Sequence, residues 1–243
     1  MTEEEWLKCE EPGSMLASIG VTGSGRKLRL FAVACCRGIQ YAFPGQDQID
    51  RRLGVAERCA DGLATQQELR KVHRFTLDGG GDVFDLFGNE TVCDEPHWAA
   101  MMAIARCERA AIIGVLNSWP PLPPLPGFFG RLRQRFVRPP RQTWWPETSR
   151  EYRAEQLRHC NLFREIFGNP FRPVAFNSAW SIDTAVSLAR QMYESRDFSA
   201  MPILADALQD AGCENDDVLS HCRDPQQTHV RGCWVVDLVL EKS

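Results

Sequence analysis

The sequence predicts a mostly α-helical protein, a multi-helical bundle with a Pro/Arg-rich irregular insertion. Two observations carry this prediction. In several stretches the apolar residues recur at three- and four-residue steps, which is the period of a helix with one buried face. Three Thr/Glu pairs also have capping-box spacing, in which a hydroxyl and a carboxylate satisfy backbone N–H groups where a helix begins. The pairs are Thr2 with Glu5, Thr65 with Glu68, and Thr148 with Glu151.

Three helices are expected in the N-terminal part of the chain. They cover residues 25–43, 50–63 and 97–116. The first two have an apolar stripe of helical period, which predicts one buried face for each. The third is apolar around its whole axis except at Arg106, Glu108 and Arg109, which favours a central core helix over a lipid-spanning one.

The C-terminal part repeats this pattern. A helix over 147–167 is expected to end where Gly168 and Asn169 can adopt the left-handed cap conformation. Further helices are predicted around residues 186–193 and 203–211, and a short one beginning at Asn215. The last run, CWVVDLVL, contains three valines that favour a strand, but its helical surroundings favour a helix.

Length and composition exclude several classes of protein. The 243 residues are 44% hydrophobic and 25% charged, which is typical of a globular chain with one large or two small domains. A net charge of −4 is too balanced for a protein that coats nucleic acid. No run reaches the roughly 18 apolar residues of a membrane span, so none is expected. The acidic start lacks a secretory pattern, which predicts a cytoplasmic location, and there the ten cysteines are expected as thiols or metal ligands.

Charge and proline content divide the chain into three segments. Residues 1–118 form an N-terminal helical segment, 119–146 a Pro/Arg-rich insertion or linker, and 147–243 a C-terminal helical segment that can also form one domain with the first. The flanking segments are acidic, whereas the middle is basic and proline-rich. Its arginines alternate with aromatic residues, so it is interpreted as a surface loop, a proline-rich ligand for another protein, a nucleic-acid-binding segment or a membrane-surface segment.

No complete catalytic signature is present. Residues 20–27 read GVTGSGRK, in which the outer glycines have P-loop spacing. However, Arg26 and Lys27 occupy the positions where the motif needs lysine and a hydroxyl, so this segment is predicted to be a linker. No nucleophile elbow or H-E-x-x-H helix is found either, and no catalytic residue is predicted.

Metal-ligand chemistry is concentrated in residues 213–233. The predicted zinc ligands are Cys213, His221, His229 and Cys233. If a helix begins near His229, then His229 and Cys233 lie one turn apart, with Cβ atoms about 5–6 Å from each other. If the last run is a strand, they stand about 13 Å apart and cannot share an ion. A packed or hydrogen-bonded core and a Cys/His nucleophile, with Cys222 or Cys233 as the thiol, are the alternatives.

Several segments resemble a paralogous family of uncharacterised proteins found in planctomycetes and related high-GC bacteria. These segments are RKLRLFAVACCR, VAERCADGLAT, IFGNPFRPV, PILADALQDAGCENDDVLSHC and HVRGCWVVDLVL. The resemblance covers both acidic segments and leaves the insertion unmatched. It implies an interaction or adaptor module with a protein partner, and it supplies no catalytic residues. The alternatives are a zinc-dependent or thiol enzyme that uses the C-terminal Cys/His cluster, and nucleic-acid binding through the insertion.

Overall fold

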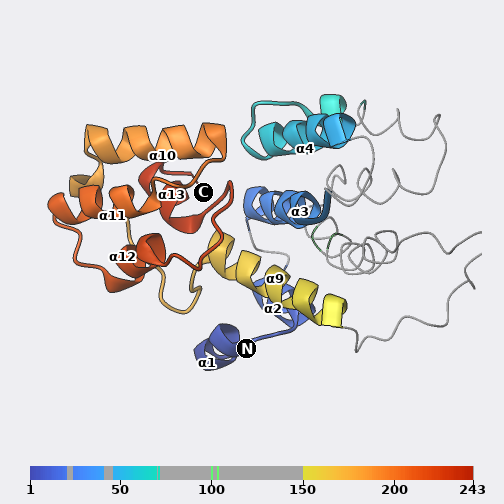
Figure 1. Ribbon diagram of the computed structural model, residues 1–243, viewed down its shortest axis with the longest axis horizontal. Helices are drawn as coiled ribbons and strands as arrows, with labels where there is room; N and C mark the ends of the chain where they lie inside the picture. The colour runs from blue at the N-terminus through green and yellow to red at the C-terminus, as the bar shows by residue number, and fades with distance from the viewer. Residues whose placement is uncertain are drawn as a thin grey trace, which may run out of the picture.

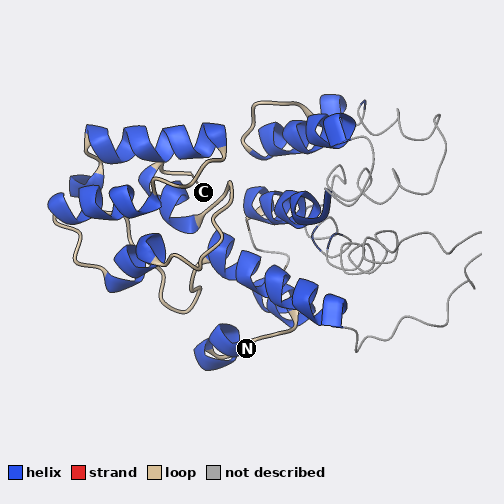
Figure 2. Cartoon of the chain, viewed as in Figure 1, coloured by secondary structure: helices blue, strands red, loops and turns tan. Residues whose placement is uncertain are grey.

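The computed structural model describes residues 1–20, 24–40, 46–69, 71, 100, 103 and 150–242. Within these ranges most residues are helical and none lies in a strand, which confirms the predicted all-α class (Figure 1) (Figure 2). The insertion over 119–146, most of the helix expected over 97–116 and the cap residue Thr148 lie outside the described residues. None of the helices in the described part is both long and apolar enough to cross a membrane.

The first of two apolar cores is built around helix α3. It is formed by α1 (Glu3–Lys8), α2 (Pro12–Ile19), α3 (Gly25–Ile39), α4 (Gln46–Ala60) and α9 (Arg150–Phe167). Helix α3 packs against both α4 and α9, and α9 also packs on α2 (Figure 1). The aromatic rings of Phe31 on α3 and Phe163 on α9 stack with their centroids 4.0 Å apart. This contact joins a helix of the N-terminal segment to the first helix of the C-terminal segment.

The second core consists of the remaining helices. They are the 3₁₀ turn η2 (Ser178–Trp180), α10 (Asp183–Ser195), α11 (Met201–Asp210), α12 (Asp216–Arg223) and α13 (Trp234–Val239). Helix α11 packs between α10 and α12, and α13 packs on α10 and α12. The boundary between the cores therefore follows α9, and the first helix of the predicted C-terminal segment packs with the N-terminal helices.

Local sequence signals account for several helix boundaries. Thr2 and Glu5 form the expected capping box, because the Thr2 backbone N–H donates to the Glu5 carboxylate and the Glu5 N–H donates to the Thr2 hydroxyl. Thr65 and Glu68 make the same reciprocal pair before the helical turn at 66–69. Helix α9 ends at Gly168, whose φ of 65° is the predicted left-handed cap conformation.

The end of the chain is helical, as its surroundings predicted. Helix α13 covers most of the CWVVDLVL run. The condition for a one-turn spacing of His229 and Cys233 is not met, because α13 begins at Trp234 and residues 227–230 are irregular before a turn at Arg231 and Gly232. The pairing of His229 with Cys233 therefore needs another explanation.

Candidate metal centre and the charged junction beside it

A tight turn, and not a helix, brings His229 close to Cys233. The Cys233 N–H donates to the Val230 carbonyl at 2.9 Å, which closes a four-residue turn. Gly232 has a φ of 98° in this turn, a conformation that side-chain-bearing residues rarely adopt. A Cβ at this position would also lie 2.9 Å from Leu30 Cδ1 on α3. The turn therefore requires glycine at position 232 for two reasons, its backbone conformation and its close contact with Leu30 on α3.

Four side chains with metal-ligand chemistry meet at this turn. Their ligand atoms all lie within 4.8 Å of one another, and they belong to Glu165, His221, His229 and Cys233. His221 Nε2 is 3.3 Å from both Cys233 Sγ and Glu165 Oε2. His229 Nδ1 is 3.2 Å from Glu165 Oε1. This group could hold a metal ion, and it unites helix α9 of the first core with α12 and the turn before α13.

The group contains three of the four residues predicted from sequence, with Glu165 where Cys213 was expected. Cys213 is buried in the second core, directly after α11, and its thiol is not among the converging ligand atoms. The spare thiol Cys222 is also buried there, and burial raises its pKa to about 12. A sequence signal for Glu165 did exist, because it lies one helical turn after Leu162 on the buried face of α9.

Glu165 is an ionised carboxylate at the centre of the group. Its side chain has no exposed surface, and burial alone would raise its pKa. Hydrogen bonds from His221 and His229 outweigh burial and lower the pKa to about 2. The carboxylate also accepts hydrogen bonds from Gln227 Nε2 at 3.0 Å and from the Val230 N–H at 3.2 Å. A buried carboxylate with two imidazole nitrogens and a thiol sulfur beside it is a set of ligand atoms that a metal cation can bind.

The thiol of Cys233 has the wrong environment for a nucleophile. It lies within reach of a base, His221 Nε2, as a Cys/His pair requires. However, Cys233 is fully buried, and burial together with the nearby Glu165 charge raises the pKa of its thiol well above the ordinary value. A reactive cysteine needs an accessible thiolate in electropositive surroundings. These contacts therefore favour a ligand or packing role for Cys233.

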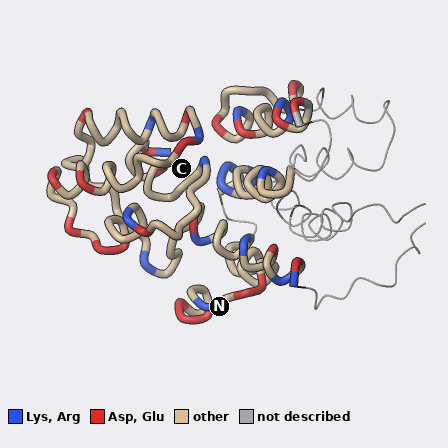
Figure 3. Tube along the Cα trace, viewed as in Figure 1, with Lys and Arg blue, Asp and Glu red and all other residues tan. Residues whose placement is uncertain are grey.

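A network of charged residues lies next to the candidate metal centre, where the two cores meet. Arg26, which opens α3, donates to Asp61 after α4 at 3.0 Å and to the Tyr193 hydroxyl on α10 at 2.7 Å. It also binds the Asp237 carboxylate on α13 at 2.5 and 2.9 Å. Arg26 thus connects both cores. Residues of positive and negative charge lie together at this junction (Figure 3).

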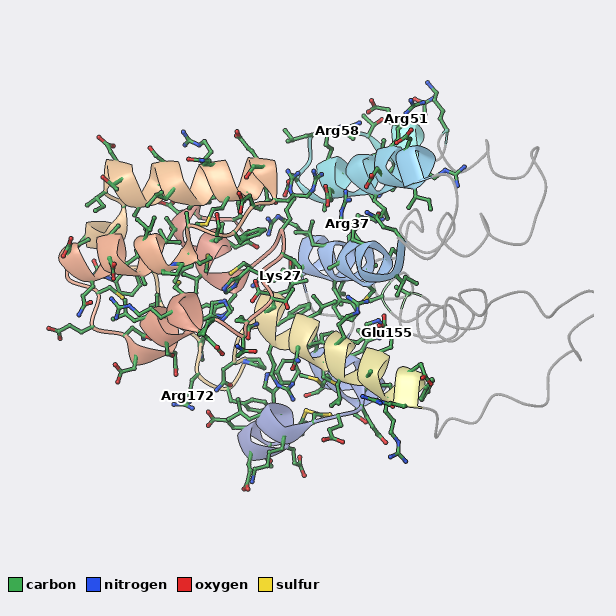
Figure 4. All side chains as sticks on the ribbon, viewed as in Figure 1. Lys27, Arg37, Arg51, Arg58, Glu155 and Arg172 are labelled. Atoms are coloured by element: carbon green, nitrogen blue, oxygen red, sulfur yellow. The ribbon has the colours of Figure 1, made fainter. Side chains whose placement is uncertain are left out.

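A third carboxylate in the same junction is shared by three arginines. Glu57 on α4 is buried and accepts from Arg37 Nε at 2.9 Å and from Arg196 Nε at 3.1 Å. Arg231 Nη1 in the turn lies 3.6 Å from it and Nη2 donates to Asp61 at 2.7 Å. Figure 4 shows Arg37 between α3 and α4. Burial would raise the pKa of Glu57, but Arg196 and Arg37 lower it.

Comparison with protein-family models, with curated proteins and with solved structures finds no match for this chain. The resemblance to the planctomycete family therefore stays a prediction.

Proposed function

We propose that this chain is a zinc protein, in which Glu165, His221, His229 and Cys233 hold one structural Zn²⁺, and that it acts as an interaction or adaptor module. The observation that carries the zinc proposal is the convergence of four ligand atoms of the types that zinc prefers, two imidazole nitrogens, one carboxylate oxygen and one sulfur. The adaptor role rests on the family resemblance and on the closed character of the site.

The spacing of these atoms supports a tetrahedral ion. Zinc binds nitrogen and oxygen at about 2.0–2.2 Å and sulfur at about 2.3 Å, so its tetrahedral ligand atoms lie about 3.3–3.6 Å from one another. The distances from His221 Nε2 to Cys233 Sγ and to Glu165 Oε2, both 3.3 Å, are already in this range. The widest pairs, up to 4.8 Å, would close by small side-chain movements.

The burial of the ligands favours a structural ion over a catalytic one. A catalytic zinc keeps one position open for water or substrate, whereas a structural zinc has four protein ligands. Glu165 and Cys233 are fully buried here, and the two histidines are nearly so. With all four bound, the ion would tie α9 to α12 and to the turn before α13.

Two matched cysteine variants test the proposal. The purified protein, prepared without chelator, is analysed for zinc by mass spectrometry together with Cys233→Ser and Cys213→Ser. Both cysteines are buried and both changes are the same, but only Cys233 belongs to the converging group. We expect about one zinc per chain in the native protein and in Cys213→Ser. In Cys233→Ser the zinc content should fall at least tenfold. Protein that neither contains nor takes up zinc, or an equal loss in both variants, would contradict the proposal.

A further inference from the structure

A cavity of about 360 Å³ lies beside the charged junction. It is bounded by α3, α9, the end of α10 and the segment that leads into the turn, so both cores contribute to its wall. Its volume falls in the range of small-molecule sites, roughly 300–1,000 Å³. One part of the wall is apolar and includes Leu30, Val33, Leu162, Phe198 and Val230.

The other part of the wall is rich in guanidinium groups. Four arginines line the cavity, and Glu57 is the acidic residue among the described lining residues. Arg158 on α9 is bound by Glu155 at 2.6 and 2.9 Å and by the Cys35 carbonyl at 2.8 Å, so it is committed to the fold. The other three, Arg37, Arg196 and Arg231, share Glu57.

The hydrogen bonds of this cluster leave donors in excess. A carboxylate accepts about four hydrogen bonds, whereas each guanidinium carries five N–H donors. Asp50 takes one further bond from Arg37, and Asp61 takes one from Arg231. Arg231 Nε is buried without a hydrogen-bond partner in the described part of the chain. Arg196 is paired with Glu57 among these acids, and its side chain is 39% exposed.

We propose that this cavity binds a small organic anion, a carboxylate with a short apolar chain. The carboxylate would be held by the part of the Arg196 guanidinium that Glu57 does not occupy, since Glu57 accepts from Nε and Nη2 and leaves Nη1, with the charge of Arg231 beside it. The chain would lie against the apolar wall, where removal of each CH₂ group from water strengthens binding. The proposed zinc centre is not needed for this binding, although His229 belongs both to that centre and to the lining of the cavity.

Calorimetric titration with three probes tests the ligand class. Hexanoate carries both proposed features, hexanamide lacks the charge, and inorganic phosphate lacks the apolar chain. We expect hexanoate to bind at least tenfold more tightly than either of the others, since a charge-assisted hydrogen bond and a buried chain each contribute that much. Equal affinity for hexanamide would overturn the role of the arginines, and equal affinity for phosphate would overturn that of the apolar wall.

A matched pair of arginine variants tests the location. Arg196 has a φ of 61°, so Arg196→Gly removes the side chain without backbone strain. Arg223→Ala is the control, because Arg223 is 40% exposed, is also paired with a carboxylate, and lies on α12 away from the cavity lining. We expect at least a tenfold loss of hexanoate affinity in Arg196→Gly and in the charge-removing Arg196→Gln, and no change in Arg223→Ala. Unchanged affinity in both Arg196 variants would overturn the site.

The same titration in the presence of a chelator separates this site from the zinc proposal. Binding through the arginines should survive removal of metal, whereas a carboxylate that ligates zinc should lose its affinity. Loss of hexanoate binding on chelation, in protein whose circular dichroism and melting temperature are unchanged, would overturn the arginine site, whereas zinc-free protein that still binds hexanoate would support it independently of the metal.

Discussion

At the scale of single residues, Glu165 is the central residue of the candidate metal centre. It is a fully buried carboxylate that accepts from the Gln227 side chain and the Val230 N–H, between His221 and His229. A charge in such a position is stable only while its partners remain, because the desolvation cost is met by these contacts alone. The residue therefore matters to the fold whether or not an ion is bound.

We expect Glu165→Gln to lower the free energy of unfolding by about 2–4 kcal/mol, because the amide keeps the shape but loses the charge that both imidazoles face. Urea denaturation measures the change. Glu151→Gln is the matched control, the same substitution on the same helix at a partly exposed position, and should change the free energy of unfolding by less than about 0.5 kcal/mol. Similar midpoints for the two variants would contradict a central role for Glu165.

At the scale of elements, the turn that ends in Cys233 positions two of the four candidate ligands. Gly232 is required there both for its φ of 98° and for the close approach to Leu30. The apolar face of α3 therefore sets the place of the turn, and through it the distance between His229 and Cys233.

We expect Gly232→Ala to lower the free energy of unfolding by about 1–3 kcal/mol, since the methyl group is strained in this backbone conformation and meets Leu30. Gly54→Ala is the control. Gly54 is inside α4 with nothing within 4 Å of an added Cβ, and alanine there should stabilise the protein by about 0.5–1 kcal/mol. Urea denaturation of both variants checks the opposite signs, and equal shifts would show that the turn is not strained by a side chain.

Sequence reasoning recovered the helices better than the site. Local signals sufficed for the caps at Thr2 and Gly168, because their partners lie within a few residues. Glu165 was missed because its partners lie about 55–70 residues further along the chain, and proximity across a fold cannot be read from local spacing. The ligand atoms of His229 and Cys233 do lie close together, but a turn containing Gly232 brings them there and not the helix on which the expected pairing depended.

At the scale of the whole molecule, buried carboxylates hold the two cores together. Glu57 on α4 and Asp61, just after that helix, bind arginines of both cores. Within the first core, Glu155 binds Arg158 and His159 of its own helix, α9. Burial would raise the pKa of each carboxyl, but the hydrogen bonds and charges of the partners outweigh it and lower the pKa, to about 2 for Glu155. The junction therefore depends on ionised acids.

Stability should decrease in acid. A carboxyl whose folded pKa is lowered stabilises the fold fully above its unfolded pKa, here about 4–4.5, and loses this contribution as pH falls toward the folded value. Burial raises the pKa of Asp237 despite Arg26, so that group opposes the trend in part. We expect the melting temperature to fall steeply between pH 4.5 and pH 2, and less steeply in Glu155→Gln. A melting temperature independent of pH over this range would show that the fold does not depend on these ionised carboxylates.

The late position of α9 in the sequence has a consequence for folding during synthesis on the ribosome. The Phe31 face of α3 is covered by Phe163 of α9. At about 5–20 residues per second, the roughly 110 residues between the end of α3 and the start of α9 take on the order of 10 s to synthesise. For that interval the nascent chain contains the Phe31 face of α3 without the Phe163 ring that covers it in the folded protein, so this part of the first core can be completed only after α9 has been synthesised.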